Sequence, residues 1–174
     1  MTTNWAFPNS FFQYAEPDAE NVHVPWLELE NFQNLKAQDN RRIKTTRDLI
    51  HIARDPRHNI REKTYFLKMT NFIFTNVPAT PTGIELKITM NRYGRITDDT
   101  IQLTLDDEII GSNKADLSLD LNKIYGSDSD MWSTSLSSSD IVNSSFGIIM
   151  RFQSHPNWPH KCSPFIDAVE LRIH

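Results

Sequence analysis

Hydrophobic and polar residues alternate with a period of two along much of the second half of the chain. In the segment GIELKITMNR, one side of an extended chain would carry the apolar residues Ile84, Leu86, Ile88 and Met90, and the other side Glu85, Lys87 and Thr89. Four further segments repeat the pattern, with apolar faces made of Ile101, Leu103 and Leu105; Leu117, Leu119 and Leu121; Phe146, Ile148, Met150 and Phe152; and Val169, Leu171 and Ile173. Such alternation predicts strands with one face on a core and one face in water. Half-buried strands of this kind are typical of antiparallel sheets.

Turn-forming residues separate these predicted strands. Residues 91–99 contain Gly94 and two aspartates, Asp98 and Asp99, and DDEIIG places acidic residues and then Gly111 around a short hairpin. The serine-rich segment SSSDIVNSS predicts a single helical turn, with Ser137 as N-cap and Asp140 three residues later. LIHIA and TYFLKMTNFIF are further strand candidates.

No segment shows sustained apolar spacing of 3.6 residues, so helices are not expected to build the core. Roughly seven or eight short strands with polar turns predict an all-β fold, an antiparallel sandwich of two sheets. We expect a sandwich domain over residues 25–174 and an irregular arm over residues 1–24. The arm is rich in aromatic residues: Trp5, Phe7, Phe11, Phe12 and Tyr14. Two interpretations stay open for it, packing on its own domain or docking on a neighbouring subunit.

Composition places the chain among ordinary globular proteins. Of its 174 residues, 39% are hydrophobic and 23% charged, with a net charge of −4, so neither disorder nor a global basic field for nucleic acid is expected. One segment is locally basic and is interpreted as solvated surface or a docking patch; its residues are Arg41, Arg42, Lys44, Arg47, Arg54, Arg57, Arg61 and Lys63. The N-terminus lacks a basic leader followed by an apolar run, and no apolar run is long enough for a membrane helix.

The octapeptide YGSDSDMW, residues 125–132, raises the question of a metal or catalytic loop because Asp128 and Asp130 are one residue apart. An EF-hand would need a further oxygen ligand, a central glycine and a distal glutamate. A glycosidase would need two carboxylates facing each other across a cleft. A calcium site of another type stays open, but we favour a structural loop. In that interpretation Gly126 supplies an unusual backbone angle, the aspartates accept backbone N–H groups, and Trp132 lies on the edge of the sandwich.

Other chemistry-bearing residues give no enzyme signature, and we predict neither catalytic, cofactor-binding nor metal-binding residues. Cys162 is the only cysteine and is flanked by Pro159 and Pro164, so we expect an inert thiol in a loop. The histidines are scattered without metal-ligand spacing: His23, His51, His58, His155, His160 and His174. The segment SHPNWPHKC offers Trp158, with His155, Asn157 and His160, as a candidate sugar-binding platform. We favour packing or an interface contact for this tryptophan.

Taken together, several motifs resemble a β-sandwich module of tailed-bacteriophage virion proteins. The residues that carry the resemblance are Asn113-Lys114-Ala115, Tyr125-Gly126, Asp130-Met131-Trp132, Asp140-Ile141 and the segment 144–147, within a similarity that spans about Trp26 to His174. The module implies a jelly-roll sandwich found in tail, neck, baseplate or capsid-decoration proteins, and it implies no catalytic residues. The chain departs from the module at Ser127, Ser133 and Leu136, and in its HPNWPHKC insertion.

The resemblance and the aromatic arm together predict a non-enzymatic structural component of a virion. Other virion proteins would be its partners, with a homo-oligomer in a symmetric assembly. No nucleic acid, membrane or cofactor is expected, and the protein would be assembled in the host cytoplasm and carried in the particle. The alternative is a carbohydrate-binding module of a phage tail, with Trp158 at a glycan site.

Overall fold

The computed structural model describes residues 2–15, 23–27, 35–36, 41–49, 51–55, 58–118 and 122–174. The larger sheet contains β1 (Ser10–Tyr14), β2 (His23–Val24), β6 (Lys63–Thr64), β7 (Phe66–Thr70), β9 (Ile96–Leu105), β10 (Glu108–Ile110) and β12 (Gly147–Ser154). The smaller sheet contains β3 (Ile43–Lys44), β8 (Ile84–Tyr93), β11 (Lys123–Gly126) and β13 (Ser163–Ile173). A hairpin of β4 (His51–Asp55) and β5 (His58–Arg61) pairs only with itself among the described strands. The helical turn α1 (Ser138–Ile141) lies between β11 and β12.

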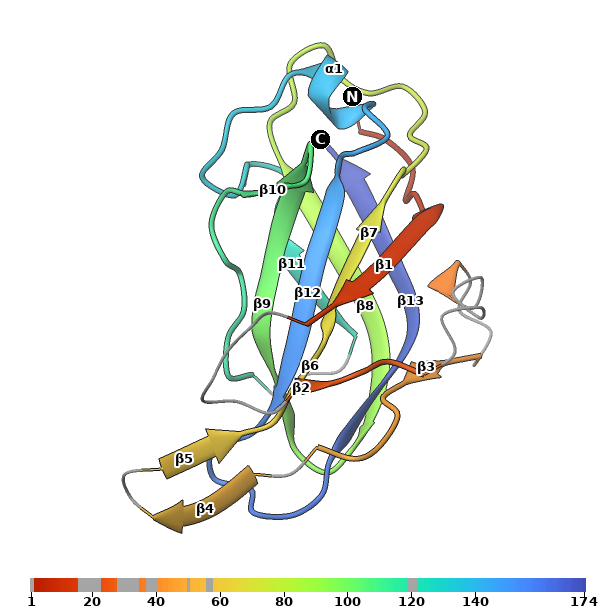
Figure 1. Ribbon diagram of the computed structural model, residues 1–174. Coiled ribbons are helices and arrows are strands. Elements are labelled where there is room, and N and C mark those ends of the chain that lie inside the picture. The colour runs from red at the N-terminus through yellow and green to blue at the C-terminus, as the bar shows by residue number, and fades with distance from the viewer. Residues whose placement is uncertain are drawn as a thin grey trace.

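The two sheets pack against each other, which confirms the predicted all-β sandwich (Figure 1). Strand pairs in the described residues are antiparallel apart from β2 with β6. The alternation in β8 is as predicted, because Ile84, Leu86 and Ile88 are buried and the residues between them are partly exposed. The jelly-roll connectivity stays a prediction.

The central strand β12 differs from the predicted half-buried pattern. Ile148, Met150 and Phe152 face the core as expected, but the remaining residues of the strand are all buried too. Arg151 shows why: its guanidinium lies 4.0 Å from the centre of the Phe66 ring, and its Nε donates to Asp99. Aromatic and charged side chains from neighbouring strands therefore cover the outer face of β12, so burial there does not follow from periodicity alone.

The prediction of a strand around Leu117 is wrong for the residues that the structure describes. Leu117 lies outside any strand and is 57% exposed, while Leu119 and Leu121 lie outside the described residues. In this segment a side chain forms a hydrogen bond with a nearby backbone N–H group. The Asp116 carboxylate accepts the N–H of Ser118 at 2.7 Å, and such bonds compete with a strand ladder. The strand of this region, β11, begins only at Lys123.

The N-terminal residues 2–15 belong to the sandwich, which corresponds to the first of the two interpretations of the arm. Thr3 N donates to Ile173 O at 2.8 Å, and its hydroxyl accepts the N–H of Ile173 at 2.9 Å. Ala6 forms a bridge with Leu171. The following strand β1 pairs with β7 along its full length. These contacts fix the segment across both sheets while leaving Phe12 and Tyr14 58% and 42% exposed.

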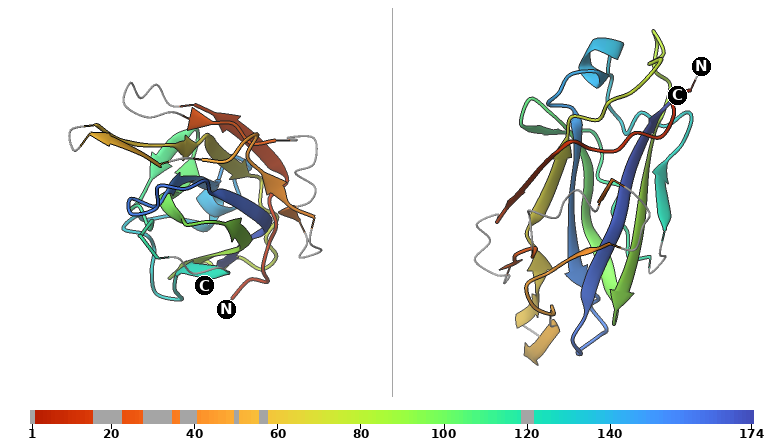
Figure 2. Two further views of the ribbon diagram at one scale, coloured as in Figure 1. Left: turned by 90° about the horizontal axis from the view of Figure 1, so that it is seen from below. Right: turned by 90° about the vertical axis from the view of Figure 1, so that its right-hand side faces the viewer.

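The sandwich has two distinct ends (Figures 1 and 2). The end that we call apical carries α1, the β9–β10 turn, the loop after β11 and both chain ends. The end that we call basal carries the β8–β9 turn, the loop 155–162 and the projecting β4–β5 hairpin. The predicted helical turn is confirmed, with a capping box between Ser137 and Asp140. Within the described residues, no helix reaches the length and apolar character that crossing a membrane requires.

Candidate functional site

The octapeptide loop, residues 125–132, begins at a glycine that the backbone requires. Gly126 has a φ of +80°, and a Cβ there would lie 2.1 Å from the carbonyl oxygen of Ile84. A side chain is excluded both by the backbone angle and by the close approach of β8. The loop therefore leaves β11 in one fixed direction, directly over the first residues of β8.

Asp130 and Trp132 hold the loop onto the sandwich. The Trp132 ring is fully buried, and its Nε1 donates to Ile84 O at 2.9 Å. Asp130 Oδ1 accepts the N–H of Trp132 at 2.8 Å, and its Oδ2 lies 2.7 Å from Lys114 Nζ. Partial burial pushes the pKa of Asp130 upward, but the bonds from Lys114 and Trp132 outweigh it and leave this pKa below its usual range. The expected ring position at the sandwich edge is corrected: Trp132 is part of the core, because the carbonyl of Ile84 satisfies its N–H inside.

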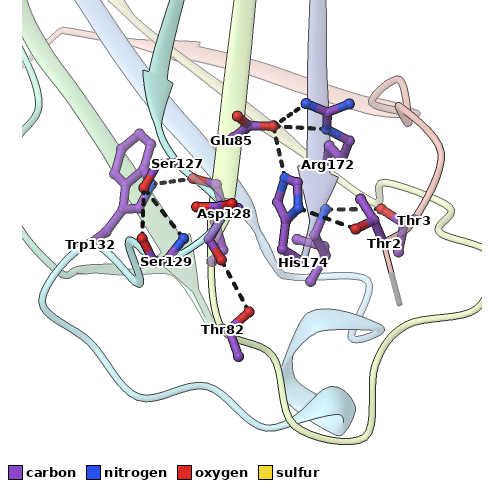
Figure 3. Close-up of polar contacts among 12 residues, drawn as sticks. Thr2, Thr3, Thr82, Glu85, Ser127, Asp128, Ser129, Trp132, Arg172 and His174 are labelled. Atoms are coloured by element: carbon purple, nitrogen blue, oxygen red, sulfur yellow. Dashed lines mark hydrogen bonds and ion pairs between the residues drawn. The ribbon is translucent and has the colours of Figure 1, made fainter.

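Asp128 helps to hold the loop on the sandwich through its backbone carbonyl and not through its side chain. Its carbonyl accepts the hydroxyl of Thr82 at 3.1 Å, while its side chain is exposed at the apical end (Figure 3). Ile84 N donates to Asp130 O at 3.0 Å, so the entry to β8 binds two carbonyls of the loop. In the described part of the chain, no group of three or more His, Cys, Asp or Glu side chains is arranged to hold a metal ion. With both oxygens of Asp130 engaged, the loop acts as a brace between β11 and β8.

Other residues of the sequence motifs described above also contact their own chain. Asn113 Oδ1 accepts the N–H groups of Ile101 and Ala115 at 2.9 and 3.0 Å. A Cβ at Gly147 would lie 1.9 Å from Met69 O. The geometry of these residues therefore accounts for a stable fold, and it does not by itself point to a ligand.

The prediction of a turn for the acidic pair Asp98 and Asp99 is wrong. Both residues lie in β9, because the turn is confined to Gly94 and Arg95. A register shift in the pairing with β12 places Asp98 opposite the buried Phe152. There the carboxylate accepts the hydroxyl of Tyr125 at 2.7 Å. Burial raises the pKa of Asp98 despite this bond, and burial followed by the charge of Asp98 raises the pKa of Tyr125.

A second polar cluster joins the two ends of the chain, and sequence reasoning missed it. The Glu85 carboxylate on β8 accepts bonds from Arg172, on β13, and from His174 Nε2 at 2.8 Å. His174 Nδ1 lies 3.2 Å from the Thr2 hydroxyl (Figure 3). Burial pushes the pKa of Glu85 upward, but the bonds from His174 and Arg172 leave it below its usual range. The alternating pattern of β8 and β13 would have been enough to predict that Glu85 and Arg172 lie on outward faces of their strands. That the two residues pair with each other depends on the register between β8 and β13.

The order hydroxyl, imidazole, carboxylate in this cluster is that of a hydrolase triad. The carboxylate of Glu85 is nevertheless shared with the Arg172 guanidinium, which lies 4.4 Å from the Trp5 ring. That guanidinium neutralises the charge that would stabilise an imidazolium. Thr3 and His174 are also held by backbone bonds to Ile173 and Gly83. We therefore interpret the cluster as a clasp between the N-terminal segment and the C-terminal strand.

The outer face of β1 carries exposed aromatic side chains, Phe12 and Tyr14. An open hollow of about 450 Å³ is lined by Phe12, Tyr14, Lys68 and Asp107. Tyr14 packs on Phe66 with ring centres 5.3 Å apart, and Lys68 Nζ lies 2.6 Å from Asp107 Oδ1. The hydrogen bond from Lys68, followed by its charge, lowers the pKa of Asp107. The site thus combines exposed aromatic surface with one ion pair, a composition suited to a protein contact.

Trp158, the candidate sugar platform, is half-buried at the basal end. Its indole N–H donates to Lys161 O at 3.5 Å, and the ring lies so near Gly94 that a Cβ there would be 3.0 Å from Nε1. The Arg95 guanidinium lies 5.2 Å from the ring centre, and the edge-on His160 ring lies 5.0 Å away. His155 Nδ1 accepts the N–H of Asn157 at 3.1 Å, which shapes the loop. These neighbours contact the ring that a sugar would need to cover.

The remaining candidate residues of the sequence are dispersed. Cys162 is buried, and burial raises the pKa of its thiol to about 12, so its reactive thiolate is disfavoured. Within the basic segment, Arg47 forms a two-pronged ion pair with Glu62, at 2.7 and 2.9 Å. Lys63 pairs with Asp99 at 3.1 Å. Arg57 lies outside the described residues.

Comparisons with known proteins identify no relative: no family model, no curated protein and no solved structure matches the chain. The fold class is therefore established as an all-β sandwich from the structure alone. What the protein does has to be inferred from its own surfaces.

Proposed function

We propose that the protein is a non-enzymatic structural component of a virion, of the kind found in tailed bacteriophages. In this role the sandwich is a rigid body, and β1 with the loops around it binds neighbouring virion proteins. The single observation that carries the proposal is the exposed aromatic edge strand β1, with Phe12 58% exposed. The virion setting rests on the sequence resemblance, whose residues Asn113, Trp132 and Gly147 have defined structural roles.

The position of β1 supports a binding role on physical grounds. It is the last strand of its sheet, since β7 pairs on one side and no other described strand pairs with it. Exposed aromatic side chains on such an edge add apolar area to a contact. Phe12 and Tyr14 stand on either side of Gln13, so both project from the same face.

The alternative, a carbohydrate-binding module of a phage tail, has Trp158 as its candidate residue. The ring is half-buried and has the Arg95 guanidinium against it, an arrangement that favours packing of the loop 155–162. We therefore retain the structural role as the proposal. Binding to a glycan array that is abolished by Trp158→Ala would reverse this preference.

A double substitution, Phe12→Ser with Tyr14→Ser, tests the proposal. Removing residues 1–24 would be a poor test, because it also deletes the β1 ladder and the buried Ala6 and Val24. The double variant should fold, keep the thermal stability of the unmodified chain within a few degrees, and be incorporated into purified particles at least about tenfold less.

The matched control is Ile124→Ser, which removes a 49% exposed apolar side chain from β11, in the other sheet. It should be incorporated normally. Normal incorporation of a folded double variant would falsify the role of β1, and absence of the unmodified chain from purified particles would contradict the virion proposal as a whole.

A further inference from the structure

The two ends of the sandwich carry opposite charge. At the apical end, the segments 106–114 and 127–146 contain the acidic residues Asp106, Asp107, Glu108, Asp128, Asp130 and Asp140, against one basic residue, Lys114. Glu108 and Asp128 are exposed, and the side chain of Asp107 is 94% exposed although it pairs with Lys68. This end therefore presents a negative surface to solvent.

The basal end has the reverse composition. The β8–β9 turn and the loop 155–162 contribute Arg92, Arg95 and Lys161 without any acidic residue. Arg61 ends β5 of the projecting hairpin, whereas Arg47, which precedes β4, is paired with Glu62. Arg95 and Lys161 are exposed. A positive surface thus lies at the opposite end of the sandwich from the negative one (Figure 1).

The β4–β5 hairpin gives an independent sign that something covers the basal end. It projects beyond the body of the sandwich (Figures 1 and 2), and among the described strands it forms a two-stranded sheet of its own. An isolated two-stranded hairpin is marginally stable in water and usually needs a third strand or a packing surface. A neighbouring molecule at this end would supply that surface.

We propose that copies of this chain associate end to end, with the basal end of one copy, including the β4–β5 hairpin, docked on the acidic apical end of the next. The inference deepens the proposed structural function and rests on it for its biological setting. Charge complementarity identifies the partner as a second copy, because the same chain carries both surfaces. Exposed apolar side chains at both ends, Ile73 and Val142 on one and Tyr93 on the other, would form the less polar part of the contact.

The geometry of this contact sets the kind of assembly. The surfaces that meet are different, so the contact is heterologous and each added copy presents a new free end. Such contacts close into rings or extend into filaments. A symmetric dimer, in which one patch meets itself, would bring like charges together at either end and is disfavoured.

The experiment uses sedimentation of the full chain at increasing protein concentration and at low and high salt. We expect species larger than dimers at low salt, with the dissociation constant rising at least about tenfold between roughly 50 and 500 mM NaCl. Backbone amides of β4 and β5 should exchange with deuterium more slowly in the associated state than in the dilute monomer.

Two charge-reversed variants sharpen the test. Glu108→Lys with Asp128→Lys removes most of the negative charge of the apical segments, and Arg95→Glu with Lys161→Glu leaves the β8–β9 turn and the loop 155–162 with more acidic than basic residues. Each variant alone should associate at least about tenfold more weakly, and an equimolar mixture should recover association, because opposite ends meet again. Lys36→Glu is the matched control for Lys161→Glu, since it makes the same charge change opposite Ala168, in the middle of β13; it should leave association unchanged.

Three outcomes would overturn the inference: a monomer under all conditions, a closed dimer insensitive to the reversals, or variants whose mixture does not recover association. Any of these leaves the proposed function standing, because incorporation into particles can proceed through partners of other sequence. Failure of incorporation with end-to-end association intact would instead contradict the proposed function alone.

Discussion

The octapeptide loop and strand β1 use their aromatic and charged residues in opposite ways. In the loop, Trp132 is fully buried and Asp130 is bound on both carboxylate oxygens. In β1, Phe12 is 58% exposed although the strand is fully paired along β7. The loop, which the sequence marks as candidate chemistry, serves to hold the fold together. The strand, whose aromatic residues could have been core, is the part that faces outward.

The difference shows that a polar motif and an aromatic motif are both ambiguous until their surroundings are known. A carboxylate whose charge is paired with an ammonium attracts a cation less strongly than a free one, as for Asp130 beside Lys114. An aromatic ring on an edge strand has one face left over after packing on its neighbours, as Tyr14 does on Phe66. Availability for other molecules, and not residue type, separates the two regions.

The largest effect that tests this comparison is expected for Trp132→Ala. It removes a fully buried ring and leaves the carbonyl of Ile84 without its indole donor, so unfolding should become easier by about 3–5 kcal/mol. Phe12→Ala is the matched aromatic change on the exposed strand and should cost less than about 1 kcal/mol. Urea denaturation followed by fluorescence measures both. Equal losses would show that the β1 side chains stabilise the fold as much as those of the loop.

A smaller effect of opposite sign is expected for Asp98→Asn, next to the start of the loop. The pKa of Asp98 is raised by burial, so its ionisation opposes folding at neutral pH and ceases to do so once the carboxyl is protonated. The asparagine should stabilise the chain by up to about 1 kcal/mol at pH 7 and still accept the Tyr125 hydroxyl.

The pH dependence supplies the control for this prediction. The advantage of Asp98→Asn should shrink as the pH falls through the raised pKa of Asp98 toward the ordinary aspartate range, where both folded and unfolded chains are protonated. Thermal unfolding of the two proteins across this range measures it. A destabilised variant at pH 7 would mean that the charge interaction with Lys123, 3.8 Å away, outweighs burial.

The smallest effect separates the two aspartates of the loop. Asp130→Asn keeps an acceptor for the Trp132 N–H but loses the ion pair with Lys114, so a cost of about 0.5 kcal/mol is expected. Asp128→Asn should be close to neutral, because Asp128 serves through its carbonyl. Chemical denaturation of both variants in one buffer measures the two changes in the free energy of unfolding. A strong calcium-dependent gain in stability that either substitution abolishes would contradict the interpretation of the loop as a structural brace.

The sequence by itself determined the fold class and several local structures. Period-two alternation identified β8, β9, β12 and β13, since a sheet face that packs on a core must be apolar at every second position. The capping box of Ser137 and Asp140 was predictable because its bonds span only three residues. Gly126 and its unusual backbone angle were also anticipated from local turn chemistry.

Only the tertiary structure decided what depends on partners distant in sequence. The register shift between β9 and β12 turned Asp98 inward, and the pairing of β8 with β13 brought Glu85 to Arg172 and His174. Likewise, the exposure of Phe12 and the burial of Trp132 follow from which strands end up beside them. The alternating pattern of apolar and polar residues predicts which face of a strand a side chain lies on. Whether that side chain is buried, and what it pairs with, depends on what the rest of the chain places against that face.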